Sequence, residues 1–367
     1  MKYEWATRGF GIPAAAFGTE SHDLHRNRRA AVAPYFSKAS VYQLEPVVQS
    51  VVDKLVLRLN SLQGTDNVIN IVHVFAALTA DIIVQYAFAK PYGFIDSPDF
   101  ASSWHRAIMD VSEIFHTFKQ FGWMEPTMRK IPPWIAEKMN PQMSSLSRIQ
   151  AVSQVHDSGA TYFELSVNQI VRQQVLSAKD DLDQGRKPDG QKTIFYDLLK
   201  SDQLRPEDKT VDRLEAEGLS VVAAGSMTVA HTLTVITYHV IQDKAILQKL
   251  QTELKTVMPH SDSQPKWSQL EQLPYLTAVI LEGLRWGHGV THRLQRISPD
   301  IALQYHDYII PPGTPVGMSA PLIHSDPTIF PSPRSFRPSR WLESSSTDLR
   351  KYLVSFSKGT RQCLGIK

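Results

Sequence analysis

Apolar residues recur at helical spacing over most of the chain. Between residues 42 and 62, Val48, Val51, Val52 and Leu55 lie three or four positions apart, which is the pattern of a helix buried on one side. Comparable patterns predict further helices over residues 69–89, 98–129, 155–177, 193–201, 218–242, 239–258 and 276–285. The sequence therefore predicts a mainly α fold.

Strand signals are confined to a short region near the C-terminal end. Residues 291–296 and 305–317 read as short strands, the second interrupted by the turn Pro311-Pro312-Gly313, and they predict a small β-element. Around residues 178–212 the composition shifts to Lys, Asp, Glu, Gly and Pro, which predicts a solvated connector. We predict a single domain over residues 1–367 with this connector inside it.

Composition excludes several classes of protein. With 42% hydrophobic and 20% charged residues the chain is ordinary for a globular protein, and a net charge of +3 is too small to indicate nucleic-acid binding. One cysteine cannot build a disulfide framework. Residues 218–242 lack Asp, Glu, Lys and Arg but contain eight Ser, Thr and His residues, so we expect a buried helix and no membrane span in this chain. A peripheral membrane contact is compatible with the sequence.

The strongest chemical signal surrounds the only cysteine, Cys363. A thiolate in a glycine-bounded turn beside cations suits a metal ligand or a nucleophile, whereas a lone cysteine is otherwise often a small buried hydrophobe. The order Phe356-x-x-Gly359-x-Arg361-x-Cys363-x-Gly365 decides between these interpretations. It resembles the haem-ligand loop of the cytochromes P450, the haem-thiolate monooxygenases.

A basic stretch near residues 22–38 fits the same resemblance. On a helix His25 and Arg29 share a face, and the plain interpretation is a solvated cationic surface. In the resembled family a helix at this place gives a cation to the haem propionates. By position Arg29 matches that cation, His25 stands where the family has its aromatic partner, and Arg296 matches a second propionate-binding cation.

A glycine interrupts the apolar helix predicted over residues 218–242. Glycine inside a helix costs about 1 kcal/mol relative to alanine, so Gly225 has either a packing or a functional reason. The order Ala224-Gly225-x-x-Thr228 resembles the bulged P450 helix that admits dioxygen beside a threonine. Met227 stands where the family has an acid, and methionine cannot shuttle a proton. Water held by Thr228 and Ser226 is one substitute route for protons. The alternatives are a slow or uncoupled enzyme and an enzyme specialised for another reaction.

Two further motifs predict a structural network. Glu282 and Arg285, three residues apart on a helix, would by themselves be an ordinary surface ion pair. The resemblance identifies them as the family's Glu-x-x-Arg motif, with Arg340 of Phe336-Arg-Pro-Ser-Arg340 as the partner. Two arginines sharing one glutamate would fix the segment that precedes the cysteine loop.

Together these motifs imply an incomplete cytochrome P450 fold of the fungal biosynthetic type. The family's N-terminal anchor and sheet and its C-terminal helix and hairpin have no counterpart in this chain, so we expect a form truncated at both ends. The implied cofactor is haem b with Cys363 as its axial ligand. The implied partners are dioxygen, a lipophilic small molecule, and an NADPH-dependent flavoprotein reductase.

The implied activity is a monooxygenase of fungal secondary metabolism that inserts one oxygen atom from dioxygen. Two alternatives stay open: a truncated haem-binding protein without turnover, and a haem-thiolate isomerase or dehydratase. The resemblance implies the endoplasmic reticulum membrane as the location, and the lack of an anchor in the sequence leaves the cytoplasm open as an alternative.

Overall fold

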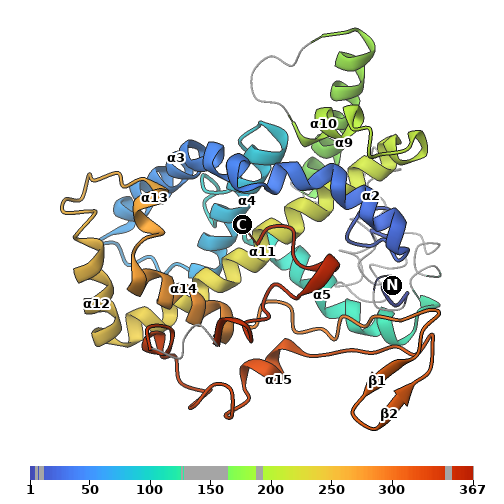
Figure 1. Cartoon of the computed structure of the whole chain (residues 1–367). Helices are drawn as coiled ribbons and strands as arrows, with labels where there is room; N and C mark the ends of the chain where they lie inside the picture. The colour runs from blue at the N-terminus through green and yellow to red at the C-terminus, as the bar shows by residue number, and fades with distance from the viewer. Residues whose placement is uncertain are drawn as a thin grey trace. The chain divides into compact units, whose positions relative to one another are not determined.

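The structure is a computed structural model that describes residues 1–4, 7, 12–124, 127, 164–186, 193–343 and 349–366. Most of these residues are helical, and the described strands form one two-stranded sheet (Figure 1). The predicted mainly α fold with a small β-element is confirmed. The chain forms two compact units: unit 1 comprises Met1–Ser37, Ala80–Gly225 and Arg293–Met318, and unit 2 comprises Lys38–Thr79, Ser226–His292 and Ser319–Lys367.

Unit 1 packs helices around an aromatic core. Phe88 and Phe195 stack with their ring centroids 5.4 Å apart. The buried Asp81 carboxylate accepts hydrogen bonds from the amides of Gly93, Phe94 and Ile95 at 2.9–3.0 Å, which fixes the turn after α4. The helical elements of unit 1 are α2 (His22–Val32), η1 (Ala33–Phe36), the second part of α4 (Ile71–Phe88), α5 (Ser102–Gln120), α9 (Glu164–Asp183), α10 (Ile194–Lys200), η2 (Pro206–Lys209) and the first part of α11 (Val211–Gln242).

Unit 2 holds the elements on which the cysteine loop rests. The Asp243 side chain caps the first turn of α12 by accepting hydrogen bonds from the amides of Ala245 and Ile246. Glu253 of α12 accepts from the amides of Tyr275 and Leu276 at 2.8 and 2.7 Å, which ties α12 to the start of α14. The helical elements of unit 2 are α3 (Lys38–Leu62), the first part of α4, the second part of α11, α12 (Lys244–Leu254), α13 (Trp267–Leu270), α14 (Pro274–Trp286), α15 (Ala320–His324), η3 (Pro338–Trp341) and η4 (Gly359–Arg361).

The β-element is smaller than the sequence suggested. Strands β1 (Leu303–Tyr305) and β2 (Tyr308–Ile310) pair antiparallel, with Gln304 opposite Ile309. Residues 291–296 were predicted as a strand, but there the backbone makes only isolated bridges at Arg296, with Lys2 and Val316. Alternation over so few residues does not distinguish a paired strand from an extended segment.

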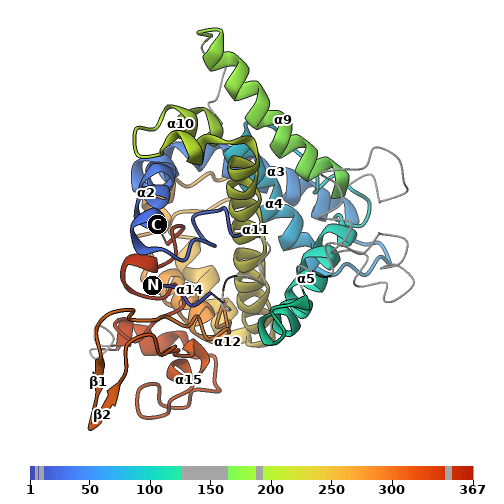
Figure 2. The ribbon, with the colours of Figure 1, turned by 90° about the vertical axis from the view of Figure 1, so that its right-hand side faces the viewer.

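Helix α11 is less buried than predicted. It runs as one α-helix from Val211 to Gln242 (Figure 2), and the local bulge that the resemblance implies stays a prediction. Ala224, Thr228 and His231 on one side of it are exposed. Within the part of the chain that the structure describes, two helices, α4 and α11, are long and apolar enough to span a membrane by length and composition, although the core helix of a soluble protein passes the same test.

The connector predicted near residues 178–212 is partly packed. Helix α9 continues to Asp183, and Ile194, Phe195 and Leu198 of α10 are buried. The helix predicted over 193–201 is therefore confirmed, but it contributes to the core of unit 1 and is not solvated. Residues 187–192, and residues 155–163 of the predicted helix 155–177, lie outside the described residues. The single-domain interpretation stays a prediction.

Candidate functional site

Cys363 lies in a short loop that its own backbone closes. The Cys363 amide donates to the Phe356 carbonyl oxygen at 2.8 Å, and the Gln362 amide donates to the Gly359 oxygen at 3.0 Å across η4. Gly359 has a left-handed φ of 77°, which glycine adopts without strain. A Cβ at Gly359 would meet no atom within 4 Å, so the backbone angle and not crowding favours glycine there.

The chemistry of this loop fits a haem-iron ligand. The Cys363 side chain is free and exposed, and Cβ atoms added at Gly359 or Gly365 would meet nothing within 4 Å in the described structure. A cysteine thiolate is a soft iron ligand, and a flat macrocycle requires backbone that is uncrowded beside that ligand. The Arg361 side chain, in the 3₁₀ turn before the cysteine, is partly buried.

Two side-chain hydrogen bonds hold the residues just before the loop. The Val354 amide donates to Nε2 of His324 at 3.0 Å, and the Ser355 hydroxyl donates to the Leu284 carbonyl oxygen at 2.7 Å. The loop is thereby attached to α15 and to α14, the helix that carries the Glu-x-x-Arg motif.

Glu282 is the centre of a fully buried charge network. Its carboxylate accepts five hydrogen bonds at 2.8–3.2 Å: two from Arg285, and one each from the Arg337 amide, the Arg340 guanidinium and the Trp341 indole. The side chains of Glu282, Arg285 and Arg340 are 0% exposed. The structure thus brings together the three residues predicted to form this network.

The two arginines also satisfy backbone carbonyls of the segment between α15 and η3. Arg285 donates to the oxygens of His324 and Pro333 at 3.0 and 2.9 Å, and Arg340 donates to Pro331 at 2.9 Å. Burial works to raise the pKa of Glu282, but the hydrogen bonds and charges of Arg285 and Arg340 lower that pKa below its ordinary value. The network therefore keeps a buried carboxylate charged.

Gly225 has a packing reason in unit 1. A Cβ added to it would lie 2.6 Å from Cγ1 of Ile83 on α4, far inside van der Waals contact. Only glycine lets α11 approach α4 this closely at that point. A role for Gly225 at the cofactor stays a prediction.

The polar groups around Thr228 are divided between two sides of α11. Ser226 is 0% exposed, and its carbonyl oxygen accepts a hydrogen bond from the Thr79 hydroxyl at 2.8 Å. Thr228 is exposed on the side that also carries Ala224 and His231. Residues two apart on a helix point in nearly opposite directions, so a water held jointly by Ser226 and Thr228 does not fit this geometry.

The basic helix α2 uses its cations in different ways. Arg28 donates to Asp208 at 2.6 and 2.8 Å and to the Thr19 hydroxyl at 2.8 Å, so it is committed to structure. Arg29 is partly buried and makes no ion pair with any other described residue. His25 is 5% exposed. The predicted solvated surface therefore holds for only part of α2, and Arg29 remains available to an anion.

Arg296 lies in an extended segment of unit 1. Its backbone pairs with that of Val316, the two amides each donating to the other carbonyl at 2.8 Å. Its guanidinium donates to the Leu294 and Gln295 oxygens at 2.8 and 3.1 Å, and burial lowers the pKa of this group. Arg296 is thus a half-buried cation, which suits a carboxylate partner.

Comparison with known proteins decides the family. The family described as Cytochrome P450 matches residues 13–367. The chain is 38% identical to cytochrome P450 monooxygenase MO6277 of Ascocoryne sarcoides over 100% of this chain and 70% of that protein. It is 37% identical to tryptophan 6-hydroxylase fscE of Fusarium equiseti over 100% of this chain and 68% of that protein. It belongs to the cytochrome P450 family.

This P450 is a monooxygenase, an enzyme of the oxidoreductase class, because its fungal relatives carry the names of monooxygenases and hydroxylases. A third relative, N-acetyltryptophan 6-hydroxylase ivoC of Emericella nidulans, is 35% identical over 100% of this chain and 68% of its own length. The predicted site residues of the P450 fall in both units. Unit 1 carries His25, Arg29, Ala224, Gly225 and Arg296, and unit 2 carries Thr228, Phe356, Gly359, Arg361, Cys363 and Gly365.

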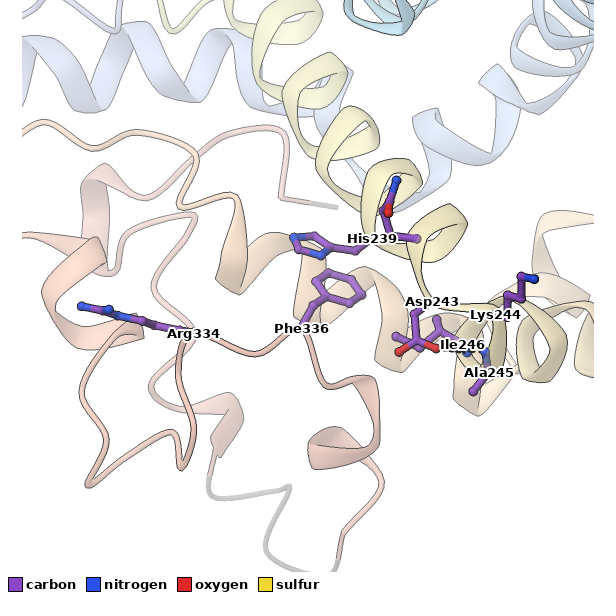
Figure 3. Close-up of a pocket in the computed structure, with 8 residues that line it drawn as sticks. His239, Asp243, Lys244, Ala245, Ile246, Arg334 and Phe336 are labelled. Atoms are coloured by element: carbon purple, nitrogen blue, oxygen red, sulfur yellow. Dashed lines mark hydrogen bonds between the residues drawn. The ribbon is translucent and has the colours of Figure 1, made fainter.

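An open hollow in unit 2 does not involve these residues. About 520 Å³ in volume, it is lined by His239, Asp243, Ile246, Arg334 and Phe336 among others. The His239 and Phe336 rings stack 4.5 Å apart, and Arg334 points away from them (Figure 3). No predicted cofactor residue lines this hollow, so we do not assign it to the P450 reaction.

The contacts of three further residues, Trp341, His231 and His324, were not predicted from the sequence, although Trp341 stands in the motif that contains Arg340. Trp341 donates from its indole to Glu282 at 2.9 Å, and its place directly after Arg340 was the available signal. His231 lies three residues after Thr228, with Nε2 3.0 Å from the Gly287 oxygen. His324 holds Val354 across 30 residues of sequence, and no local pattern indicates such a contact.

Proposed function

We propose that this P450 monooxygenase holds haem b through the Cys363 thiolate and inserts one oxygen atom from dioxygen into a lipophilic small molecule of fungal secondary metabolism. The observation that carries the proposal is the free, exposed Cys363 in a backbone-closed loop, attached to the segment that the buried Glu282 network holds.

The residues that would hold the cofactor have distinct tasks. Cys363 would be the thiolate ligand of the haem iron, while Phe356, Gly359 and Gly365 shape the backbone around it. Arg29, Arg296, Arg361 and His25 would donate charge-assisted hydrogen bonds to the propionates. When bound, the haem would supply dioxygen binding and cleavage of the O–O bond, which a thiolate ligand favours.

Proton supply would depend on the exposed side of α11. The Thr228 hydroxyl, exposed beside Ala224, would hold dioxygen by a hydrogen bond and pass protons to it. Met227 has no proton to give. Bulk water and the imidazole of His231, the ionisable side chain nearest to Thr228 along α11, are the remaining sources.

Electrons would come from NADPH through a separate flavoprotein reductase at the endoplasmic reticulum membrane, the usual location of the family. Two relatives are named as hydroxylases of tryptophan and N-acetyltryptophan. Indole compounds are therefore the first substrates to test.

A carbon monoxide difference spectrum of the reduced, haem-reconstituted protein tests the ligand. We expect a red-shifted, thiolate-type Soret band in the natural protein and its loss in Cys363→Ala. Ser357→Ala, two residues before the Gly359 turn, is the matched control and should keep the band. A natural protein without the band, or a Cys363→Ala protein with it, would refute Cys363 ligation.

Met227 supports a second candidate, a haem-thiolate isomerase or dehydratase that needs no oxygen activation. Incorporation of ¹⁸O from ¹⁸O₂ into an indole product separates the two, because an isomerase or dehydratase takes no oxygen atom from dioxygen. We expect incorporation, and a rise in labelled product in Met227→Glu, which restores an acid next to Thr228. Unlabelled product would favour the second candidate.

A further inference from the structure

His324 is a fully buried imidazole that makes polar contacts on both its ring and its backbone. It is 0% exposed at the end of α15. Its carbonyl oxygen accepts from Arg285 at 3.0 Å, and its Nε2 accepts from the Val354 amide at 3.0 Å. One residue therefore contacts the Glu282 network through its backbone and the start of the cysteine loop through its side chain.

The ring is held in a single orientation by packing. It stacks on His288 at 5.9 Å with an interplanar angle of 16°, and the edge of Phe330 contacts it at 6.1 Å and 86°. These two rings on different sides restrict rotation of the imidazole. Nε2 consequently stays directed at Val354.

The hydrogen bond also fixes the tautomer of the ring. Because the Val354 amide is a donor, Nε2 must carry a lone pair and the proton must sit on Nδ1. Burial, together with His288 and Arg285, lowers the pKa of His324 to about 4. The imidazole is neutral at physiological pH and remains an acceptor.

We propose that His324 is a positioning residue for the Cys363 ligand. Its backbone is bonded to Arg285 of the Glu282 network and its ring to the Val354 amide, so the network holds Val354 in place through His324. Ser355 and Phe356 follow Val354 and begin the loop that the Cys363 amide closes. The inference rests on the proposed haem-thiolate function. It assigns to a residue outside the cysteine motif the task of holding the sulfur at a fixed place.

Hydrogen exchange of the haem-reconstituted full chain tests the contact itself. The amides of Ser357, Gln362 and Cys363 are hydrogen-bonded within the loop. In His324→Leu, which has no acceptor, we expect these amides to exchange roughly tenfold faster while the amides of α14 keep their rates. In His324→Gln, whose Oε1 reaches the place of Nε2, we expect rates within about twofold of the natural protein.

Two further variants keep the test decisive. His324→Asn keeps a polar side chain that is too short to reach the Val354 amide, so we expect the loop amides to exchange faster in it as well. This variant supplies the test if His324→Leu does not fold. Ser325→Ala, at the exposed residue after His324, leaves both the ring stack and the Val354 bond in place, so it is the control and should match the natural protein.

The thiolate-type carbon monoxide band of the same variants supplies the second readout. We expect its share of the total haem to fall in His324→Leu and His324→Asn and to recover in His324→Gln. Unchanged loop exchange in the leucine and asparagine variants, or failure of glutamine to restore it, would overturn the proposal. A natural protein without the band would instead contradict the proposed function, and the exchange rates would still report on the loop.

Discussion

Two clusters of buried charge in this P450 use the same residue types with opposite results. Glu282 in unit 2 accepts five hydrogen bonds within its network. Glu217 in unit 1 is similarly buried, but its hydrogen bonds in the described structure come from the Ala16 amide at 3.0 Å and from Arg213 at 2.6 Å. In addition, Nε and Nη1 of Arg213 are buried with no partner among the described residues.

The number of donors decides the direction of the pKa shift. Burial works to raise the pKa of both acids. At Glu282 the hydrogen bonds and charges of two arginines overcome burial, and the pKa lies below its ordinary value. At Glu217 burial outweighs the attraction of Arg213, and the pKa lies above it. In these two clusters, therefore, the donors around the buried carboxyl group decide whether its charged form is favoured.

Glu282→Gln should have the largest effect on stability. The amide keeps the shape of the side chain but leaves the positive charges of Arg285 and Arg340 buried without a counter-charge, which costs about 3–5 kcal/mol. We expect a loss of this size in urea unfolding at pH 7, together with poor retention of haem.

The exposed pair of Arg337 and Glu343 supplies the control for that experiment. These side chains are 39% and 50% exposed and lie 3.3 Å apart, so Glu343→Gln should change the free energy of unfolding by less than about 1 kcal/mol. A Glu282→Gln protein as stable as this control would show that the network is not what holds unit 2 together.

Glu217→Gln should cost less than Glu282→Gln. The substitution removes a carboxylate that burial already disfavours, which offsets part of the loss of its contact with Arg213. We expect a decrease of about 1–2 kcal/mol in the free energy of unfolding at pH 7. Equal losses at Glu217 and Glu282 would mean that the hydrogen-bond count does not separate the two clusters.

The two clusters also differ in how well the sequence predicted them. Glu282, Arg285 and Arg340 stand in motifs of fixed local spacing, so the resemblance named all three and the structure confirms their contact. Glu217 meets the Ala16 amide across 201 residues, and nothing in the local sequence indicates such a pairing. Local spacing alone predicts the contact of Glu282 with Arg285 inside one helix, and the resemblance supplied Arg340, 58 residues after Glu282 in the chain. A contact between distant segments that belongs to no motif, such as that of Glu217 with Ala16, depends on the packed fold.

The same distinction explains what was predicted at the cysteine. The motif around Cys363 indicated a turn with glycines, and the structure places a backbone-closed loop there. The contact of His324 with Val354 was not predicted, because no local sequence pattern distinguishes a buried histidine from an exposed one. Ser226 and Thr228 were predicted to hold one water together, but residues two apart on a helix point in nearly opposite directions, and the structure places them on two sides of α11.

The pH dependence of stability should have opposite signs at the two glutamates. Both have an ordinary pKa of 4.5. Because the folded pKa of Glu282 is lower, its contribution is present above about pH 4.5 and is lost as pH falls through the folded pKa. Because the folded pKa of Glu217 is higher, the unfolded chain loses its proton first, and stability falls as pH rises from about 4.5 through the folded pKa.

Urea unfolding of both Gln variants across pH separates these slopes. Glu282→Gln should remove part of the acid-side loss, and Glu217→Gln should remove part of the decline above about pH 4.5. If both variants altered the same side of the profile, the opposite pKa shifts assigned to the two acids would be wrong.

The smallest effect should come from a charge cluster that is not buried. Arg172 of α9 donates to Asp212 at 3.0 Å and to Glu215 at 2.8 Å on α11, but the Arg172 side chain is 45% exposed. Solvent screens such a cluster, so Arg172→Ala should change the free energy of unfolding by about 0–1 kcal/mol.

A double-mutant cycle with Glu215→Gln isolates the pair from other effects of the alanine. We expect its coupling energy to fall toward zero in about 1 M salt, where the screening length is about 3 Å. A coupling above about 2 kcal/mol, or one that salt leaves unchanged, would show that exposure does not weaken these pairs and would remove burial as the reason why Glu282 matters most.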